Sequence, residues 1–208
     1  MHHRRMKDDN LASNKRYKYW RLDRLEKVIT GVLIGFIVNR VYDWASNMCR
    51  RTKIRSSLVE ELTMVHDDIL LVKSILRKKI DGSEAIGSGS YSRKIAYPIY
   101  EKYYADVCLI LNKSQRSSFQ QIFSGVEELN AFITELYTEC LNKHYCSSDA
   151  TRVRLATSYS TASDMLFFIK NHIDHPKYPL IGDQIRVELE AHREETNRFL
   201  SQHGFVFS

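Results

Sequence analysis

The sequence predicts an all-α protein in which an N-terminal membrane-associating helix is followed by an antiparallel helical bundle. Three observations indicate this fold class. One uncharged apolar run lies near the N-terminus, at residues 28–38. Apolar residues then recur with heptad spacing, and no segment alternates with period two for long enough to indicate a strand. Only 3 Pro and 8 Gly occur in 208 residues, which favours long helices.

The apolar run is the candidate membrane segment. The uncharged stretch 28–39 would measure roughly 18 Å as a helix, against about 30 Å for the hydrocarbon core of a bilayer. Snorkelling by Lys27 and Arg40 would lengthen it, and Trp20 and Trp44 bracket it as interface anchors do. The residues assigned to the membrane are Val28, Ile29, Gly31, Leu33, Ile34, Gly35, Phe36, Ile37 and Val38.

Charge and length leave three placements of this segment open. Nine Lys or Arg precede residue 28 and five follow between residues 40 and 55, so the positive-inside rule favours a cytoplasmic N-terminus only weakly. Basic residues on both sides also suit a helix lying along an anionic membrane surface. The third placement is a helix buried in a core or against a partner. A cleaved signal peptide is not expected, because no small-x-small site follows the run.

Gly31 and Gly35 form a Gly-x-x-x-Gly pair within the run. In a membrane helix such a pair lets two backbones approach closely, and it therefore predicts self-association through this segment. The alternative is simply two small residues in a short apolar helix, because the motif is common by chance.

Composition divides the chain into three parts. Residues 1–24 form a basic polar segment, and residues 1–16 within it have no helical period, which predicts disorder or a frayed helix there. Their interleaved aromatic residues suit lipid headgroups, with nucleic acid as the second choice. Residues 25–48 form the membrane-associating helix, and a basic hinge follows at 49–55. Residues 56–203 form the bundle, interrupted by a Gly- and Ser-rich flexible linker at 81–93.

Five helices are expected in the bundle region. Ser57 and Glu60 match a capping box, and Pro98 suits the first turn of the second helix. A polar break at 113–118 precedes a long helix in which Gly125 costs only about 1 kcal/mol relative to Ala. The last helix, at about 180–202, is weaker, with His192 and Thr196 at core-like positions. The heptad-spaced core residues are Leu58, Leu62, Val65, Ile69, Val72, Leu76, Tyr100, Tyr104, Val107, Leu111, Ile122, Val126, Leu129, Ile133, Leu136, Cys140, Leu155, Tyr159, Ala162, Leu166, Ile169, Ile173, Ile181, Ile185, Leu189 and Phe199.

No residue pattern indicates catalysis, so we expect a non-enzymatic protein without metal or cofactor. His172 and His175 lack the i, i+4 spacing of a zinc-binding helix, and a cationic cap on a helix C-terminus is the better interpretation. His66 and Asp67 are neighbours on a helix and should point apart on a solvated face. The four cysteines form no CxxC pair, which favours reduced thiols in a cytoplasmic bundle.

The order of elements resembles a loose group of small bacterial membrane-anchored helical proteins of mobile and anti-phage defence loci. The shared pattern is a basic N-terminal segment, a short membrane helix with a basic stop, a Leu-rich helix containing Glu61-Leu62, a linker and further helices. The resemblance implies the bacterial inner membrane and, for some members, an effector that harms the cell's own membrane when released. It supplies no catalytic residue.

Two functions of different class follow from these observations. The first is a membrane-associated, membrane-perturbing effector or toxin that binds lipid and whose bundle is restrained by a protein partner. The alternative is a soluble helical interaction subunit that binds a protein or nucleic acid through its basic N-terminal helix.

Overall fold

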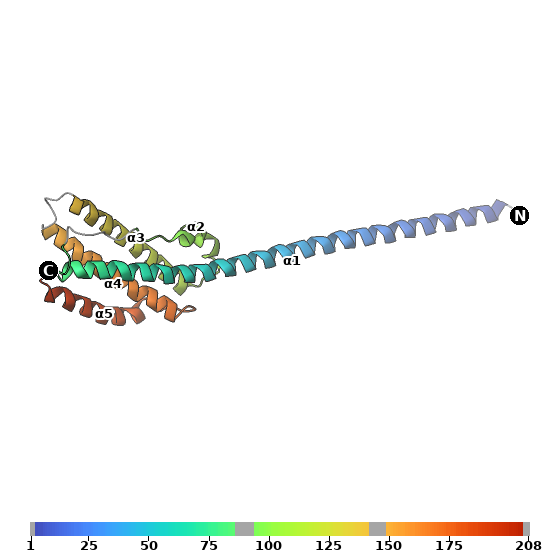
Figure 1. Ribbon diagram of the computed structural model, residues 1–208. Helices are drawn as coiled ribbons and strands as arrows, with labels where there is room; N and C mark the ends of the chain where they lie inside the picture. Colours follow the sequence, from blue (N-terminus) through green and yellow to red (C-terminus); the bar gives the residue numbers. More distant parts are fainter. Residues whose placement is uncertain (1–2, 86–93, 142–148, 206–208) are drawn as a thin grey trace. The chain divides into compact units, whose positions relative to one another are not determined.

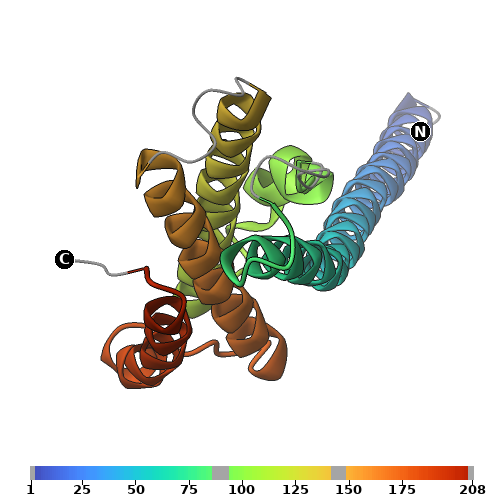
Figure 2. The same cartoon turned by 60° about the vertical axis from the view of Figure 1, so that its left-hand side comes forward.

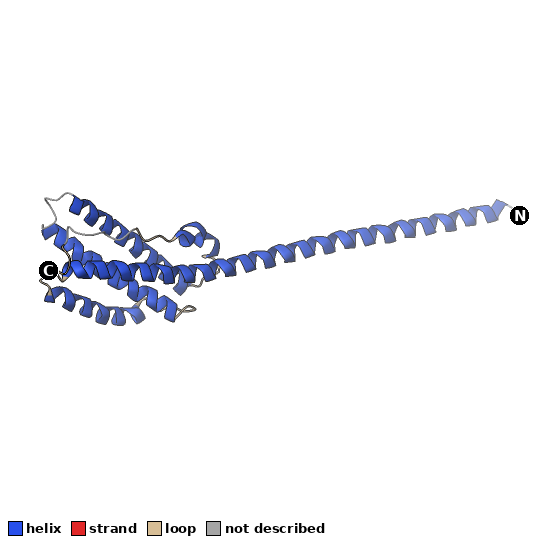
Figure 3. Ribbon diagram, viewed as in Figure 1, coloured by secondary structure: helices blue, strands red, loops and turns tan. Residues whose placement is uncertain are grey.

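The described residues form five α-helices and no strand. A computed structural model describes the backbone of residues 3–85, 94–141 and 149–205, with side chains from residue 26 onward in these ranges. The helices are α1 (His3–Ile80), α2 (Pro98–Val107), α3 (Lys113–Leu141), α4 (Asp149–Asp174) and α5 (Asp183–Gln202) (Figure 1). Figure 3 shows that helix dominates the chain, and the all-α prediction is confirmed. Two compact units divide at Thr52 and Lys53.

The unit formed by residues 53–208 is a bundle arranged around α4 (Figure 2). Ser118 of α3 lies 2.8 Å from His172 near the end of α4, while Glu139 late in α3 pairs with Arg154 early in α4. These pairings make α3 and α4 antiparallel. The connection from α4 to α5 is short and reverses the chain again, whereas the segment from α1 to α3 is long and contains α2. Figure 1 shows that the stretch of α1 within this unit runs in the same direction as α3.

The heptad-spaced residues form the core of this bundle. All six predicted positions of α1 and all six of α3 are buried, as are five of the six in α4. Ile173 is the exception at 36% exposed, because it lies in the last turn of α4. In α5 only Ile185 of the predicted set is buried, whereas Leu200, outside that set, is completely buried. The helical period thus locates the core best where it persists over several turns.

Two helix starts differ from the prediction. Ser57 lies inside α1, so no capping box forms there; α1 continues through the expected hinge at 49–55 because that stretch has no Gly or Pro. α3 begins at Lys113, before the expected break has ended. Asn112 and Gln115 form the reciprocal cap, with the Gln115 amide donating to Asn112 Oδ1 at 2.9 Å and the Asn112 amide donating to Gln115 Oε1 at 3.2 Å.

Buried polar side chains hold the segment between α1 and α3 in place. The Glu61 carboxylate, on the α1 stretch of the bundle, accepts hydrogen bonds from the amides of Ile99 and Tyr100 at 2.7 and 2.8 Å, which caps α2. The Asn130 amide pairs with both the N–H and the C=O of Ile95, at 2.9 and 3.0 Å. Of the predicted flexible linker, residues 86–93 lie outside the described residues.

Gly125 is a close-approach position within α3, which continues through it. A Cβ added there would lie 2.0 Å from Met165 Sδ and 3.2 Å from Met165 Cγ. Any larger residue at this position would therefore have to displace the end of the Met165 side chain of α4.

We expect Gly125→Ala to lower the free energy of unfolding by about 1–3 kcal/mol, because Met165 must leave its site. Helix propensity alone would instead give a gain of about 1 kcal/mol. Chemical denaturation of the full chain in detergent measures the sign. In a Met165→Ala background the same change should become stabilising, and a gain in both backgrounds would contradict the packing account.

Candidate functional site

The predicted membrane residues lie on α1, and no described part of the chain covers them. Every Val, Leu, Ile and Phe between residues 28 and 38 is 55–67% exposed. α1 contains one stretch that is long and apolar enough to cross a membrane, and none of that stretch is buried. Burial in the chain's own core is therefore not observed for this segment.

These apolar side chains surround the helix axis. At about 100° per residue, the eight large apolar residues between 28 and 38 point in all directions except one sector. Gly31 and Gly35 occupy that sector, and an ideal Cβ on either would meet nothing within 4 Å. A helix that is apolar all round is typical of a membrane span or a buried core helix, whereas a surface-lying helix has a charged face.

The predicted interface anchors fall on both sides of this segment. Trp44 is 67% exposed and Lys27 lies one residue before the apolar run. The Arg40 guanidinium carbon lies 5.6 Å from the centre of the Phe36 ring, one turn earlier in α1. Arg40 therefore folds back over the apolar segment, since helical side chains lean toward the N-terminus. The side chain of Trp20 lies outside the described residues, as do those of residues 1–24.

His172 is a neutral core residue, so the expected cationic helix cap is wrong. Its side chain is fully buried, with Nδ1 2.8 Å from Ser118 Oγ and the ring 4.4 Å from that of Phe119. Burial, and secondarily the nearby Arg55 cation, lowers the pKa of His172 to about 4. Its Nε2 has no hydrogen-bond partner among the described residues. Protonation of this ring would bury an uncompensated charge.

We expect the bundle to lose up to about 3 kcal/mol of stability as the pH falls from 6.5 toward 4, because only the unfolded chain binds a proton at His172 in that window. His172→Gln should flatten this part of the stability profile, measured by chemical denaturation at successive pH values. His175→Gln, at an exposed position, is the matched control and should leave the slope unchanged. An unchanged slope in His172→Gln would contradict the assignment.

Other sequence candidates do not assemble into a reactive site. The His66 ring and the Asp67 carboxylate lie 3.2 Å apart, so the expectation that they point apart is wrong, but Asp67 is solvent-exposed. Among the described residues, no group of three His, Cys, Asp or Glu side chains is placed to hold a metal ion. Of the cysteines that the structure describes, Cys49 and Cys108 are free thiols.

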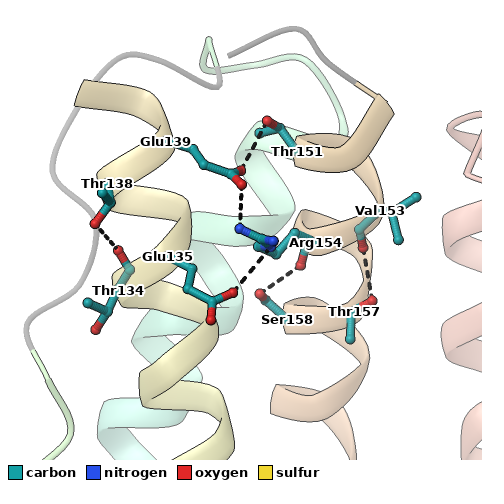
Figure 4. Close-up of polar contacts among 9 residues, drawn as sticks. All are labelled: Thr134, Glu135, Thr138, Glu139, Thr151, Val153, Arg154, Thr157 and Ser158. Atoms are coloured by element: carbon teal, nitrogen blue, oxygen red, sulfur yellow. Dashed lines mark hydrogen bonds and ion pairs between the residues drawn. The ribbon is translucent and has the colours of Figure 1, made fainter. Parts of the chain in front are cut away.

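An ion-pair network joins the end of α3 to the start of α4 (Figure 4). The Arg154 guanidinium contacts Glu139 and lies 3.3 Å from Glu135, one turn earlier on α3. The Thr151 hydroxyl donates to the second oxygen of Glu139 at 3.2 Å. These contacts satisfy part-buried charges and fix helix register, which is a structural role.

A second polar cluster was not predicted as a unit. Ser163, fully buried on α4, has Lys73 Nζ, His192 Nε2 and Thr196 Oγ1 each 2.9 Å from its hydroxyl oxygen. The polar residues at core-like positions of α5 were the available signal. Lys73 is 90 residues from Ser163 in sequence, so helical periodicity does not connect them.

Comparison of the chain with models of known families, with curated protein sequences and with solved structures gave no match.

Proposed function

We propose that this chain is a membrane-anchored helical protein. α1 would insert residues 25–48 into a bilayer, and residues 53–208 would form a bundle held at the membrane. The carrying observation is the segment 28–38, which is apolar on all sides and uncovered in the described chain. Exposed side chains of this kind are unfavourable in water by about 25 cal/mol per Å² of apolar area, and a bilayer removes that cost.

The residues after the apolar segment support this placement. Arg50 and Lys53 are exposed on α1 and Arg51 is half-buried. Cations that follow a membrane segment favour anionic headgroups by about 1 kcal/mol each. The stretch from residue 28 to residue 48 would measure roughly 31 Å as a helix, which matches the hydrocarbon thickness. Arg40 and Asp43 lie within that stretch, so their charges must reach an interface or a partner helix.

Fractionation tests this function. Membranes from cells that express the full chain are washed with high salt, then with alkaline carbonate, then with detergent. Insertion predicts release by detergent alone. Release by salt would indicate surface or nucleic-acid binding, and a protein that is soluble from the start would indicate the soluble interaction subunit.

We further propose that the anchor perturbs the membrane when several copies of the chain associate. The chain would then be a bacterial defence effector, and a protein partner would restrain its bundle. Gly31 and Gly35 leave a groove in which a second backbone can pack closely. The uncharged run 28–39 alone is shorter than the bilayer, so the need to accommodate Arg40 and Asp43 also favours thinning or oligomerisation. Associated helices would disturb the bilayer more than one helix alone.

Expression should then slow growth and depolarise the bacterial inner membrane, and Gly31→Ile with Gly35→Ile should relieve both effects. A Cβ at either position would meet no described atom within 4 Å, so protein level should stay constant. Leu33→Ile with Ile37→Leu, on the opposite face, is the matched control and should remain toxic. Toxicity with an intact membrane potential would contradict the effector mechanism.

A further inference from the structure

The bundle contains a hollow of about 440 Å³ lined by the last turns of α1 with α4 and α5. Its wall combines cations with two aromatic rings, Tyr159 and Phe199, whose centres lie 5.0 Å apart. The hollow belongs entirely to the unit 53–208 and is separate from the membrane segment.

Lys73 lies on this wall. Its ammonium donates to Ser163 Oγ at 2.9 Å and sits 5.3 Å from the centre of the Tyr159 ring. No carboxylate in the described parts of the chain lies within 4 Å of it. Burial lowers the pKa of Lys73, because desolvation of its ammonium outweighs the attraction of Glu195 and Asp164. An anion in the hollow would supply the missing compensation.

Two further cations face the same hollow. Arg77 lies with its guanidinium carbon 5.0 Å from the centre of the Phe199 ring, and Arg198 follows on α5. Neither forms an ion pair with a described carboxylate. Glu195 is the one acidic residue among those that line the hollow. Nearby Asp164 does not line it and forms an ion pair with Arg193 at 2.6 Å. Three cations therefore face one carboxylate.

The Ser163 hydroxyl positions Lys73 and is not a nucleophile. It is surrounded by Lys73, His192 and Thr196, and Ser163 is 0% exposed. The contact at 3.0 Å between His192 Nε2 and the Ser163 carbonyl oxygen, a pure acceptor, assigns the proton to Nε2. This network fixes the Lys73 ammonium on the wall of the hollow, so the cation is preorganised.

We infer that this hollow binds the phosphate group of an organic phosphate monoester, with Lys73, Arg77 and Arg198 on the phosphate and Phe199 beside the organic part. Three cations and one carboxylate leave two positive charges in excess, and a dianion balances this excess better than a monoanion does. Arginine forks and a lysine point charge are the usual phosphate ligands. A volume of about 440 Å³ lies within the range of about 300–1,000 Å³ that is typical of small-ligand sites, and the mostly polar wall suits a charged ligand.

Calorimetric titration of the full chain in phosphatidylcholine nanodiscs, with phenyl phosphate as the probe, tests this inference. We expect saturable binding that weakens with salt, and benzoate, a monoanion of similar size, should bind at least about tenfold more weakly. Lys73→Met should reduce affinity at least about tenfold, as expected for the loss of a charge-assisted hydrogen bond. Arg198→Gln keeps the buried network intact and should also weaken binding.

The matched control is Arg186→Gln, an exposed cation of α5 paired with Glu190, which should leave affinity unchanged. Nanodiscs with phosphatidic acid, a monoester lipid, separate the two sources: competition with phenyl phosphate assigns the site to a lipid headgroup, and unaltered binding assigns it to a soluble phosphate ester. Equal affinity for benzoate, an Arg198→Gln variant with unchanged affinity, or no saturable binding of phenyl phosphate would overturn the inference.

Discussion

Replacing Leu33 and Ile37 with Arg should move the full chain from the membrane to the soluble fraction. Each Arg near the centre of a membrane helix costs about 2.5–3.5 kcal/mol, so the pair shifts the partition by a factor of roughly 10³–10⁵. Both side chains are more than half exposed on α1, and the substitutions should leave the bundle intact. The carbonate-resistant fraction measured by immunoblot reports the change.

The control places the same charges elsewhere on α1. Met64 and Leu71 are 68% and 58% exposed but lie in the bundle unit, so Met64→Arg with Leu71→Arg should keep the membrane fraction of the unmodified chain. A Leu33→Arg and Ile37→Arg variant that stays with the membrane would show that another part of the chain anchors it.

The second large effect concerns the core. Ile133 is 5% exposed on α3, and Ile133→Asp would bury a carboxylate with no counter-charge. Such burial costs several kcal/mol, comparable to the whole stability of a small domain. Residues 53–208 form their own compact unit, so the separate fragment should show helical circular dichroism and a cooperative melt. Ile133→Asp should abolish that melt.

Val153→Asp is the matched control, since Val153 is 59% exposed on α4. It should shift the melting temperature by only a few degrees, as surface changes of about 0.5 kcal/mol do. Equal melting of the Ile133→Asp variant and the unmodified fragment would remove Ile133 from the core.

The core could be predicted because its signal is local. Leu58 through Leu76 repeat within one helix, and a stripe on one helix has to be buried against something. Gly125 shows the limit, because its role depends on Met165, which lies 40 residues later and on another helix. Helix propensity assigns that glycine a mild cost, whereas any larger residue there would have to displace the end of the Met165 side chain.

Polar positions were predicted less well for the same reason. His172 near a helix end suggested a cation, but its burial against Phe119 and Ser118 decides its protonation. The cluster of Lys73 with Ser163 joins α1 to α4, which are far apart in the sequence. The membrane segment, in contrast, is defined by its own residues, and the structure adds that they are exposed all round.

Thiol accessibility in intact membranes tests the central claim, insertion of residues 28–38, most directly. In one variant Leu33→Cys is the only thiol; in a companion the native Cys49, which is exposed on the same helix, is the only thiol. Insertion predicts that Leu33→Cys resists a water-soluble maleimide until detergent is added, because thiolates do not form in hydrocarbon. Cys49 should react without detergent when the reagent reaches the side of the membrane on which Cys49 lies. Reaction of Leu33→Cys in sealed membranes at the rate of Cys49 would contradict insertion.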